Sequence, residues 1–250
     1  MNVELKQAVE GLYRTFSSYR MPEHVDMSDL RDPNTEIGRM RQKPLRELSV
    51  EDLNAYAFHA LTTVGDYILF RYVLPRLLEL LPDDQYMADL EIVVSKLAYG
   101  DGGWRTWPHQ EQQAVRAFLM AWWSDSLGQS SYRADRAYGV LASIALAEDD
   151  LLPYLSCWDT HPALSATDQV ANLFAHMWDK EDQVIRHNPY LRERPAQAEQ
   201  IRRWLFRQTT LRRLERHQGV ALRRGLDDEH YVDYRVFIDV LSSLFLKGAP

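Results

Sequence analysis

The sequence has a single cysteine and no hydrophobic run that suggests a membrane span. Cys157 alone can form neither an internal disulfide nor a cysteine-rich metal site. The longest apolar region, residues 67–81, contains two arginines and a glutamate, and burying three charges in a bilayer is too costly for a spanning helix. Residues 1–12 lack the basic start and apolar core of a secretory signal. We therefore expect a cytoplasmic protein that does not enter a membrane.

The specific signatures of common catalytic machinery are also missing. The chain has no Gly-x-x-x-x-Gly-Lys phosphate loop, no Gly-x-Ser-x-Gly elbow and no His-Glu-x-x-His pair. It also lacks the paired Glu-x-x-His motifs that hold a di-iron centre in helical bundles. We predict no cofactor and no metal, and we expect a protein that is not an enzyme. An enzyme with a dispersed site of Asp, Glu and His remains an alternative, because sequence spacing would not reveal it.

Helical periodicity dominates what is present. Leu5, Val9, Leu12 and Phe16 recur at steps of three and four residues, and similar patterns follow along the 250 residues. The predicted class is all-α, as a multi-helix bundle or a short HEAT-like stack of roughly nine to ten helices. A Leu-Pro-x-Leu core at residues 74–77 and again at 152–155 favours the repeat stack. The alternative is a coincidence of prolines at helix starts in an irregular bundle.

Proline placement suggests the domain organisation. Pro22, Pro33 and Pro44 break any long helix, so we predict an N-terminal helix and Pro-rich arm over residues 1–48 and a single helical domain over 49–250. Ser49 with Asp52 resembles a capping box for a helix running to about residue 62. We expect Gly65 to be its C-cap and Asp66 to cap the next helix.

The remaining helices are predicted from the same periodicity. Thr106 is expected to cap a helix that has Pro108 in its first turn. Within the helix predicted at 197–216, Arg212 would fall in the apolar stripe, so residues 208–210 should break or bend it. The other predicted helices cover residues 86–97, 133–147, 149–158, 167–179 and 231–247.

Basic charge is concentrated in one stretch of the chain. Residues 183–226 hold eleven arginines, no lysine and three acids, a net +8 in a protein of net −7, which leaves −15 elsewhere. Arginine's planar fork suits carboxylates and phosphates. Arg203, Arg207 and Arg213 are our candidate binding residues. Pairing of this stretch with the acids at 148–150 or 227–229 is the alternative, and nucleic acid is an unlikely partner because few aromatic residues accompany the arginines.

A Gly- and Trp-rich loop at residues 99–107 is the second candidate site. Trp104, Arg105 and Trp107 belong to the residue types that dominate binding hot spots. The alternative is a tight turn whose tryptophans fill the core.

Two weaker constellations complete the search for chemistry. Cys157 and His161, with Asp159 between them, could form an activated thiol, but Pro162 puts the histidine in a turn. His176 and Asp179 are spaced to orient an imidazole, although a solvated helix end is the simpler interpretation.

Several stretches of the chain resemble a set of uncharacterised bacterial all-helical proteins. The stretches are residues 60–66 (Ala-Leu-Thr-Thr-Val-Gly-Asp), 70–71, 74–80, 103–108 (Gly-Trp-Arg-Thr-Trp-Pro), 111, 114–119, 203–205, 211 and 214–215. The resemblance covers roughly two thirds of the chain from Ser49 onward and leaves the N-terminal arm unmatched. It implies a bacterial origin and a helical fold, with a HEAT-like stack as one form of it. It brings no activity and no catalytic residues.

From these observations we expect a non-catalytic cytoplasmic protein that binds another protein. Within that class we favour a cognate inhibitor of another bacterial protein, such as an immunity protein for a toxin, because an acidic surface can cap a basic active-site cleft. The alternative is a helical-repeat scaffold that binds a peptide or nucleic acid through residues 183–226. The oligomeric state is not predicted.

Overall fold

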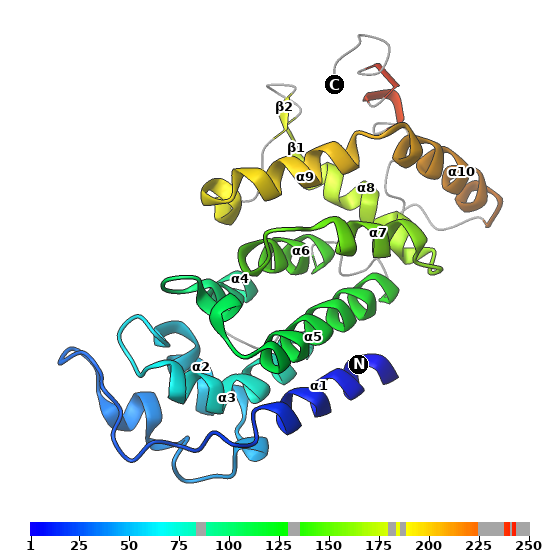
Figure 1. The fold of residues 1–250 in the computed structure, drawn as a ribbon. Coiled ribbons are helices and arrows are strands. Elements are labelled where there is room, and N and C mark those ends of the chain that lie inside the picture. The colour runs from blue at the N-terminus through cyan, green and yellow to red at the C-terminus, as the bar shows by residue number, and fades with distance from the viewer. Residues whose placement is uncertain are drawn as a thin grey trace. The chain divides into compact units, whose positions relative to one another are not determined.

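The chain is all-α, as the sequence predicts (Figure 1). The computed structural model describes residues 1–83, 89–129, 136–179, 184–185, 189–224, 238–240 and 242–243. One short antiparallel strand pair, β1 (Trp178–Asp179) with β2 (Val184–Ile185), interrupts the helices. None of the helices described combines the length and hydrophobicity that a membrane span needs. The choice between a bundle and a HEAT-like stack stays a prediction.

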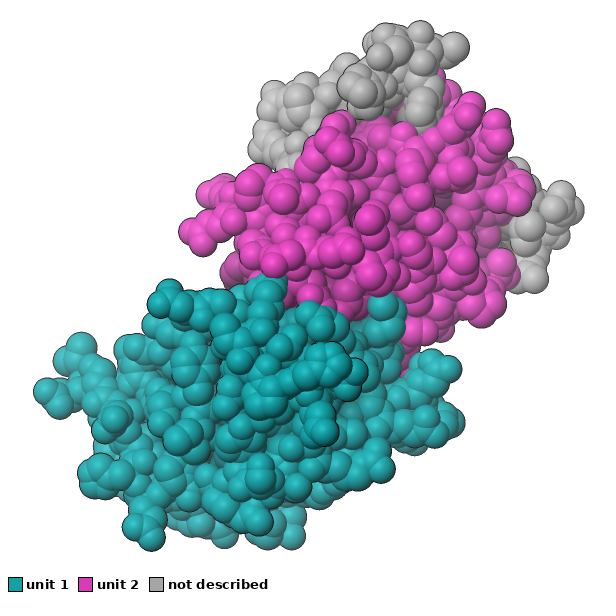
Figure 2. All heavy atoms as spheres, in the orientation of Figure 1, with its two compact units in different colours: residues 1–122 teal, residues 123–250 magenta. Residues whose placement is uncertain are grey.

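Backbone contacts divide the chain into two compact units, residues 1–122 (unit 1) and residues 123–250 (unit 2; Figure 2). The boundary falls within one long helix, α5 (His109–Gly128). The sequence prediction of a boundary at residues 48 and 49 remains a prediction. Residues 1–48 nevertheless add buried side chains to unit 1, and residues 26–28 bond to residues 63–65 through the backbone.

Unit 1 is built from helices joined by short helical turns. Its described α-helices are α1 (Val3–Thr15), α2 (Val50–His59), α3 (Tyr67–Leu80), α4 (Leu90–Ser95) and the first part of α5. The shorter turns are η1 (Asn34–Gly38), η2 (Leu45–Glu47), η3 (Leu81–Asp83), η4 (Lys96–Ala98) and η5 (Gly103–Thr106). α1 packs on α3, and α2 packs on α3 and α4. The predicted apolar stripe of α1 is buried, because Leu5, Val9 and Leu12 all face the core.

Side-chain caps fix the ends of these helices. The capping box of Ser49 and Asp52 and the cap by Asp66 are both confirmed. The prediction that α2 runs to residue 62 with Gly65 as its C-cap is wrong, because α2 ends at His59. Gly65 instead adopts φ 71°, and its N–H donates to the carbonyl of Asp26 at 2.7 Å. The glycine therefore serves a turn between segments that are distant in sequence.

The predicted cap of α5 is also corrected. α5 begins at His109, so Thr106 lies too far upstream to be its N-cap. The Thr106 hydroxyl donates instead to the Gly103 carbonyl at 2.8 Å and closes η5.

Unit 2 contains the rest of α5 and the later helices. Those described are α6 (Arg136–Ala147), α7 (Leu152–Thr160), α8 (Ser165–Met177), η7 (Pro189–Glu193), α9 (Pro195–Leu205) and α10 (Gln208–Arg224). α6 and α10 pack on α8, and α7 packs on α9. The predicted helix is broken, but the break lies at residues 206–207 and not at 208–210, which form the first turn of α10; Arg212 is exposed. Of the helix predicted at 231–247, residues 238–240 and 242–243 are helical and the rest lies outside the described residues.

Three buried tryptophans in contact with one another form part of the core of unit 2. Trp158 meets Trp123 edge to face at a centroid distance of 5.1 Å and stacks on Trp204 at 4.6 Å. All three indoles are buried. Their N–H groups donate, in chain order, to the carbonyl of Tyr154, the carbonyl of Ala166 and the carboxylate of Asp159. This tryptophan column joins α5, α7 and α9 without leaving an indole donor unpaired.

Two glycines of unit 1 should respond oppositely to alanine. Gly103 has φ 50°, and a Cβ there would meet the Leu97 carbonyl oxygen at 2.6 Å, so Gly103→Ala should lower the free energy of unfolding by at least about 2 kcal/mol. Gly11 lies inside α1 with open space around it, so Gly11→Ala should raise the free energy of unfolding by roughly 0.5–1 kcal/mol. Urea denaturation of both variants tests this. Equal stability of Gly103→Ala and the parent would contradict the conformation of η5.

Candidate functional site

The tryptophans of the 99–107 loop lie in the core of unit 1. Trp104 is completely buried and Trp107 is 4% exposed. The Trp107 ring packs edge-on against Phe16 and Phe70, and the Arg71 guanidinium lies 4.6 Å from its centroid. These contacts correspond to the alternative interpretation of the loop, in which its tryptophans fill the core. Arg105 is half-buried on the same turn, so we leave this loop out of the candidate surface.

Part of the arginine stretch forms internal contacts, as its alternative interpretation expects. Arg194 donates to the carbonyls of Ala145 and Glu148 at 3.0 and 2.7 Å and to the carboxylate of Asp149 at 2.9 Å. Its guanidinium therefore caps the carbonyl end of α6, where backbone acceptors lack helical partners. Pairing with residues 148–150 is thus present, whereas residues 227–229 lie outside the described part of the chain.

Arg213 is likewise turned inward. It donates to the carbonyl of Trp158 at 2.7 Å and to the hydroxyl of Thr167 at 2.9 Å, so it caps the end of α7 and fixes the start of α8. Burial lowers the pKa of Arg213, although a guanidinium stays charged at neutral pH. Its internal contacts correspond to a structural role.

Arg203 and Arg207, in contrast, lie beside a groove. Arg203 is 77% exposed and pairs with Glu199 at 2.7 Å. Arg202 binds the same carboxylate, and bonds from Arg202 and then Arg203 hold the pKa of Glu199 at about 2. Arg207 donates hydrogen bonds to both carboxylate oxygens of Asp159 at 2.8 Å. Arg207 is thus held in place by Asp159, while Arg203 keeps most of its surface in solvent.

The groove between α7 and α9, called here the α7–α9 groove, has a volume of about 470 Å³. Leu155 and Trp204 are the buried residues among those that line it, and Leu152 stands 61% exposed beside them. The remaining lining residues are Asp150, Ser156, Asp159, Gln200, Arg203 and Arg207. The buried part of the lining is therefore apolar, and two acids and two arginines line the rest of the groove. This combination suits a segment of a protein better than a highly charged ligand.

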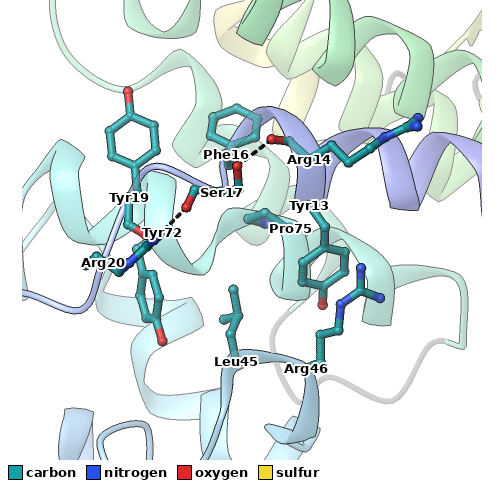
Figure 3. A pocket seen from close by; sticks show the side chains of 10 residues that line it. All are labelled: Tyr13, Arg14, Phe16, Ser17, Tyr19, Arg20, Leu45, Arg46, Tyr72 and Pro75. Atoms are coloured by element: carbon teal, nitrogen blue, oxygen red, sulfur yellow. Dashed lines mark hydrogen bonds between the residues drawn. The ribbon is translucent and has the colours of Figure 1, made fainter.

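Unit 1 contains a second cavity that the sequence analysis does not predict. Its volume is about 420 Å³, and we call it the tyrosine–arginine pocket (Figure 3). It is lined by Tyr13, Arg14, Phe16, Ser17, Tyr19, Arg20, Leu45, Arg46, Tyr72 and Pro75. The signal in the sequence is the repeated Tyr-Arg pair at residues 13–14 and 19–20, which interleaves aromatic and cationic groups.

The weaker catalytic constellation is not assembled for nucleophilic chemistry. Asp159 is bound by Arg207 and Trp204, and His161 follows the end of α7, as the sequence predicts. The His161 Nδ1 accepts the N–H of Ala163 at 3.3 Å. The side chains of His176 and Asp179 lie outside what the structure describes, and the residues it does describe contain no cluster of three or more metal-binding side chains.

Comparison with known proteins gives no further assignment: no family model, no curated protein and no solved structure matches the chain. The resemblance to bacterial helical proteins therefore stays a prediction.

Substitution of Arg213 should lower stability more than the same substitution of Arg203. Arg213→Met keeps the apolar stem but removes the donors to Trp158 and Thr167, so it should lower the free energy of unfolding by about 1.5–3 kcal/mol. The matched change Arg203→Met should have no effect beyond measurement error, because its ion pair is exposed. Urea denaturation distinguishes them, and equal effects would show that Arg213 does not fix α7 and α8.

His161 should make unit 2 sensitive to acid. Burial lowers the pKa of His161 below its ordinary value of 6.5, so the folded chain favours the neutral ring. Its contribution to stability is complete above about pH 6.5 and is lost as the pH falls through the folded-state pKa. His161→Asn keeps an acceptor for Ala163 and should make stability depend less steeply on pH between about 7 and about 5. Identical pH profiles of variant and parent would exclude this role.

Proposed function

We propose that the protein is a non-catalytic cytoplasmic binding protein that holds a segment of a partner protein in the α7–α9 groove. The observation that carries the proposal is Leu152, a large apolar side chain 61% exposed at the edge of a groove with a buried apolar lining. An exposed apolar side chain that adjoins such a lining loses contact with water when a partner covers it, which favours association.

The charged rim supports a particular kind of segment. Arg203 can turn from Glu199 to a carboxylate of the partner without leaving Glu199 unpaired, because Arg202 holds that acid with bonds of 2.7 and 2.9 Å. Arg207 is less free to exchange, since both oxygens of Asp159 bind it. We therefore expect the partner to insert one large apolar side chain and to place an acidic group beside Arg203.

Within this class we favour a cognate inhibitor of another bacterial protein, of the immunity type. The protein carries a net charge of −7, which would accelerate association with a basic partner such as a nuclease-like toxin. The groove would then provide the specific contact, and the net charge would raise the rate of association. Internal contacts of Arg194, Arg207 and Arg213 leave less free cationic surface for the scaffold alternative.

Leu152→Asp should weaken partner binding at least about 30-fold, because a charge would be buried at the centre of the contact. The matched control is Leu164→Asp, which changes another leucine of unit 2 that is 42% exposed and does not line the groove. The measurement is the dissociation constant for the purified protein encoded by the gene adjacent to that of this chain, together with rescue of growth on co-expression if that protein is toxic.

Loss of binding in Leu152→Asp alone would support the groove. Equal binding by both variants would reject the groove while keeping an inhibitor. The absence of both complex and rescue with the wild-type chain would reject the inhibitor.

A further inference from the structure

The tyrosine–arginine pocket has a different chemistry from the α7–α9 groove. Unit 1 has 13 basic and 18 acidic residues, a net charge of −5. The described residues that line this pocket nevertheless include three arginines and three tyrosines and no acid. A local excess of positive charge in a net negative unit favours an anionic occupant.

Two arginines stand at opposite sides of the cavity, each beside a tyrosine ring (Figure 3). Arg46 lies 3.7 Å from the centroid of the Tyr13 ring and binds both carboxylate oxygens of Glu10 at 2.7 Å. Arg20 lies near Tyr72 in the same view and uses one terminal nitrogen, Nη1, on the carbonyls of Ser17 and Tyr19.

Arg20 retains donors for a ligand. Among the described residues, no hydrogen bond uses its Nε or Nη2. Arg46 is paired with Glu10, and both side chains are at least half exposed. The bond from Arg46 is the main cause that lowers the pKa of Glu10, and this charged acid offsets the positive charge of Arg46 beside the pocket.

The space between the arginines is lined by rings and apolar side chains. Leu45 and Pro75 lie between the rings of Tyr13 and Tyr72 in Figure 3. The hydroxyls of Tyr13 and Tyr19 are engaged elsewhere, on Glu79 at 2.6 Å and Glu111 at 2.7 Å. The bonds to Glu79 and Glu111 fix the rings of Tyr13 and Tyr19, so these two parts of the wall need not rearrange when a ligand enters.

We propose that the tyrosine–arginine pocket binds a small phosphate ester that carries a planar ring. The phosphate would pair with Nε and Nη2 of Arg20, and the ring would pack against Tyr72 and Leu45, while Arg46 on the opposite side would add a favourable positive charge. A cavity of about 420 Å³ has the size of small-molecule sites. The site lies in unit 1, so it does not rest on the groove proposed in unit 2.

Phenyl phosphate is the probe, measured by calorimetric titration against the full chain, with inorganic phosphate and phenol as comparators. Phenyl phosphate should bind saturably, and both comparators should bind at least about 10-fold more weakly, since each lacks one half of the contact. Arg20→Gln should weaken binding about 10-fold or more. Arg39→Gln is the matched control, because Arg39 is an exposed arginine of the same unit that does not line the pocket.

Glu10→Gln provides a variant that leaves every pocket wall in place. It removes the negative charge that offsets Arg46 and makes the pocket more positive, so phenyl phosphate should bind more tightly to it than to the parent. Circular dichroism and urea denaturation establish that each variant is folded.

Four outcomes overturn the proposal. They are the absence of saturable binding, equal affinity for phenyl phosphate and inorganic phosphate, an Arg39→Gln effect as large as that of Arg20→Gln, and unchanged or weaker binding by Glu10→Gln. Loss of phenyl phosphate binding with partner binding intact would reject this site alone.

Discussion

The α7–α9 groove depends on the tryptophan column of unit 2. Trp204 belongs both to the column and to the lining of the groove, so the groove lining rests directly on the stack with Trp158. The indole of Trp204 donates to Asp159, and Asp159 in turn receives both bonds from Arg207. Core packing and groove geometry are thus one connected set of contacts, in which a change to the stack would displace the charges at the rim.

Arginine performs different tasks in this chain according to the acceptor beside it. Arg194 and Arg213 meet backbone carbonyls at the ends of α6 and α7, where a delocalised cation with several donors satisfies groups that the helix leaves unpaired. Arg203 meets only a carboxylate at the surface, so it can change partners at small cost. Among the described arginines, Arg194 and Arg213 therefore cap helices while Arg203 lies at the surface, so the cluster in sequence is not one exposed basic patch.

The sequence predicts those features that depend on neighbours along the chain. The capping box at Ser49 follows from local spacing and is present. The apolar stripe predicts a break in the helix at 197–216, and the structure has that break two residues earlier than predicted. The role of Gly65 could not be predicted, because the carbonyl it bonds belongs to Asp26. The sequence predicts Arg203 and Arg207 as binding residues but not Leu152, since the exposure of Leu152 depends on how α9 packs on α7. The sequence does not predict the tyrosine–arginine pocket, because the pocket joins α1, η2 and α3.

That pocket places cations where the surrounding unit is acidic, and like charges that gather in one cavity oppose folding unless something offsets them. Part of the offset is visible: Glu10 pairs with Arg46, and carbonyls of residues 17 and 19 bind Arg20. Among the described residues, these contacts leave Nε and Nη2 of Arg20 to bind an occupant of opposite charge. A phosphate ester with a planar ring would offset the positive charge of the arginines, and its ring would cover the apolar walls of the cavity.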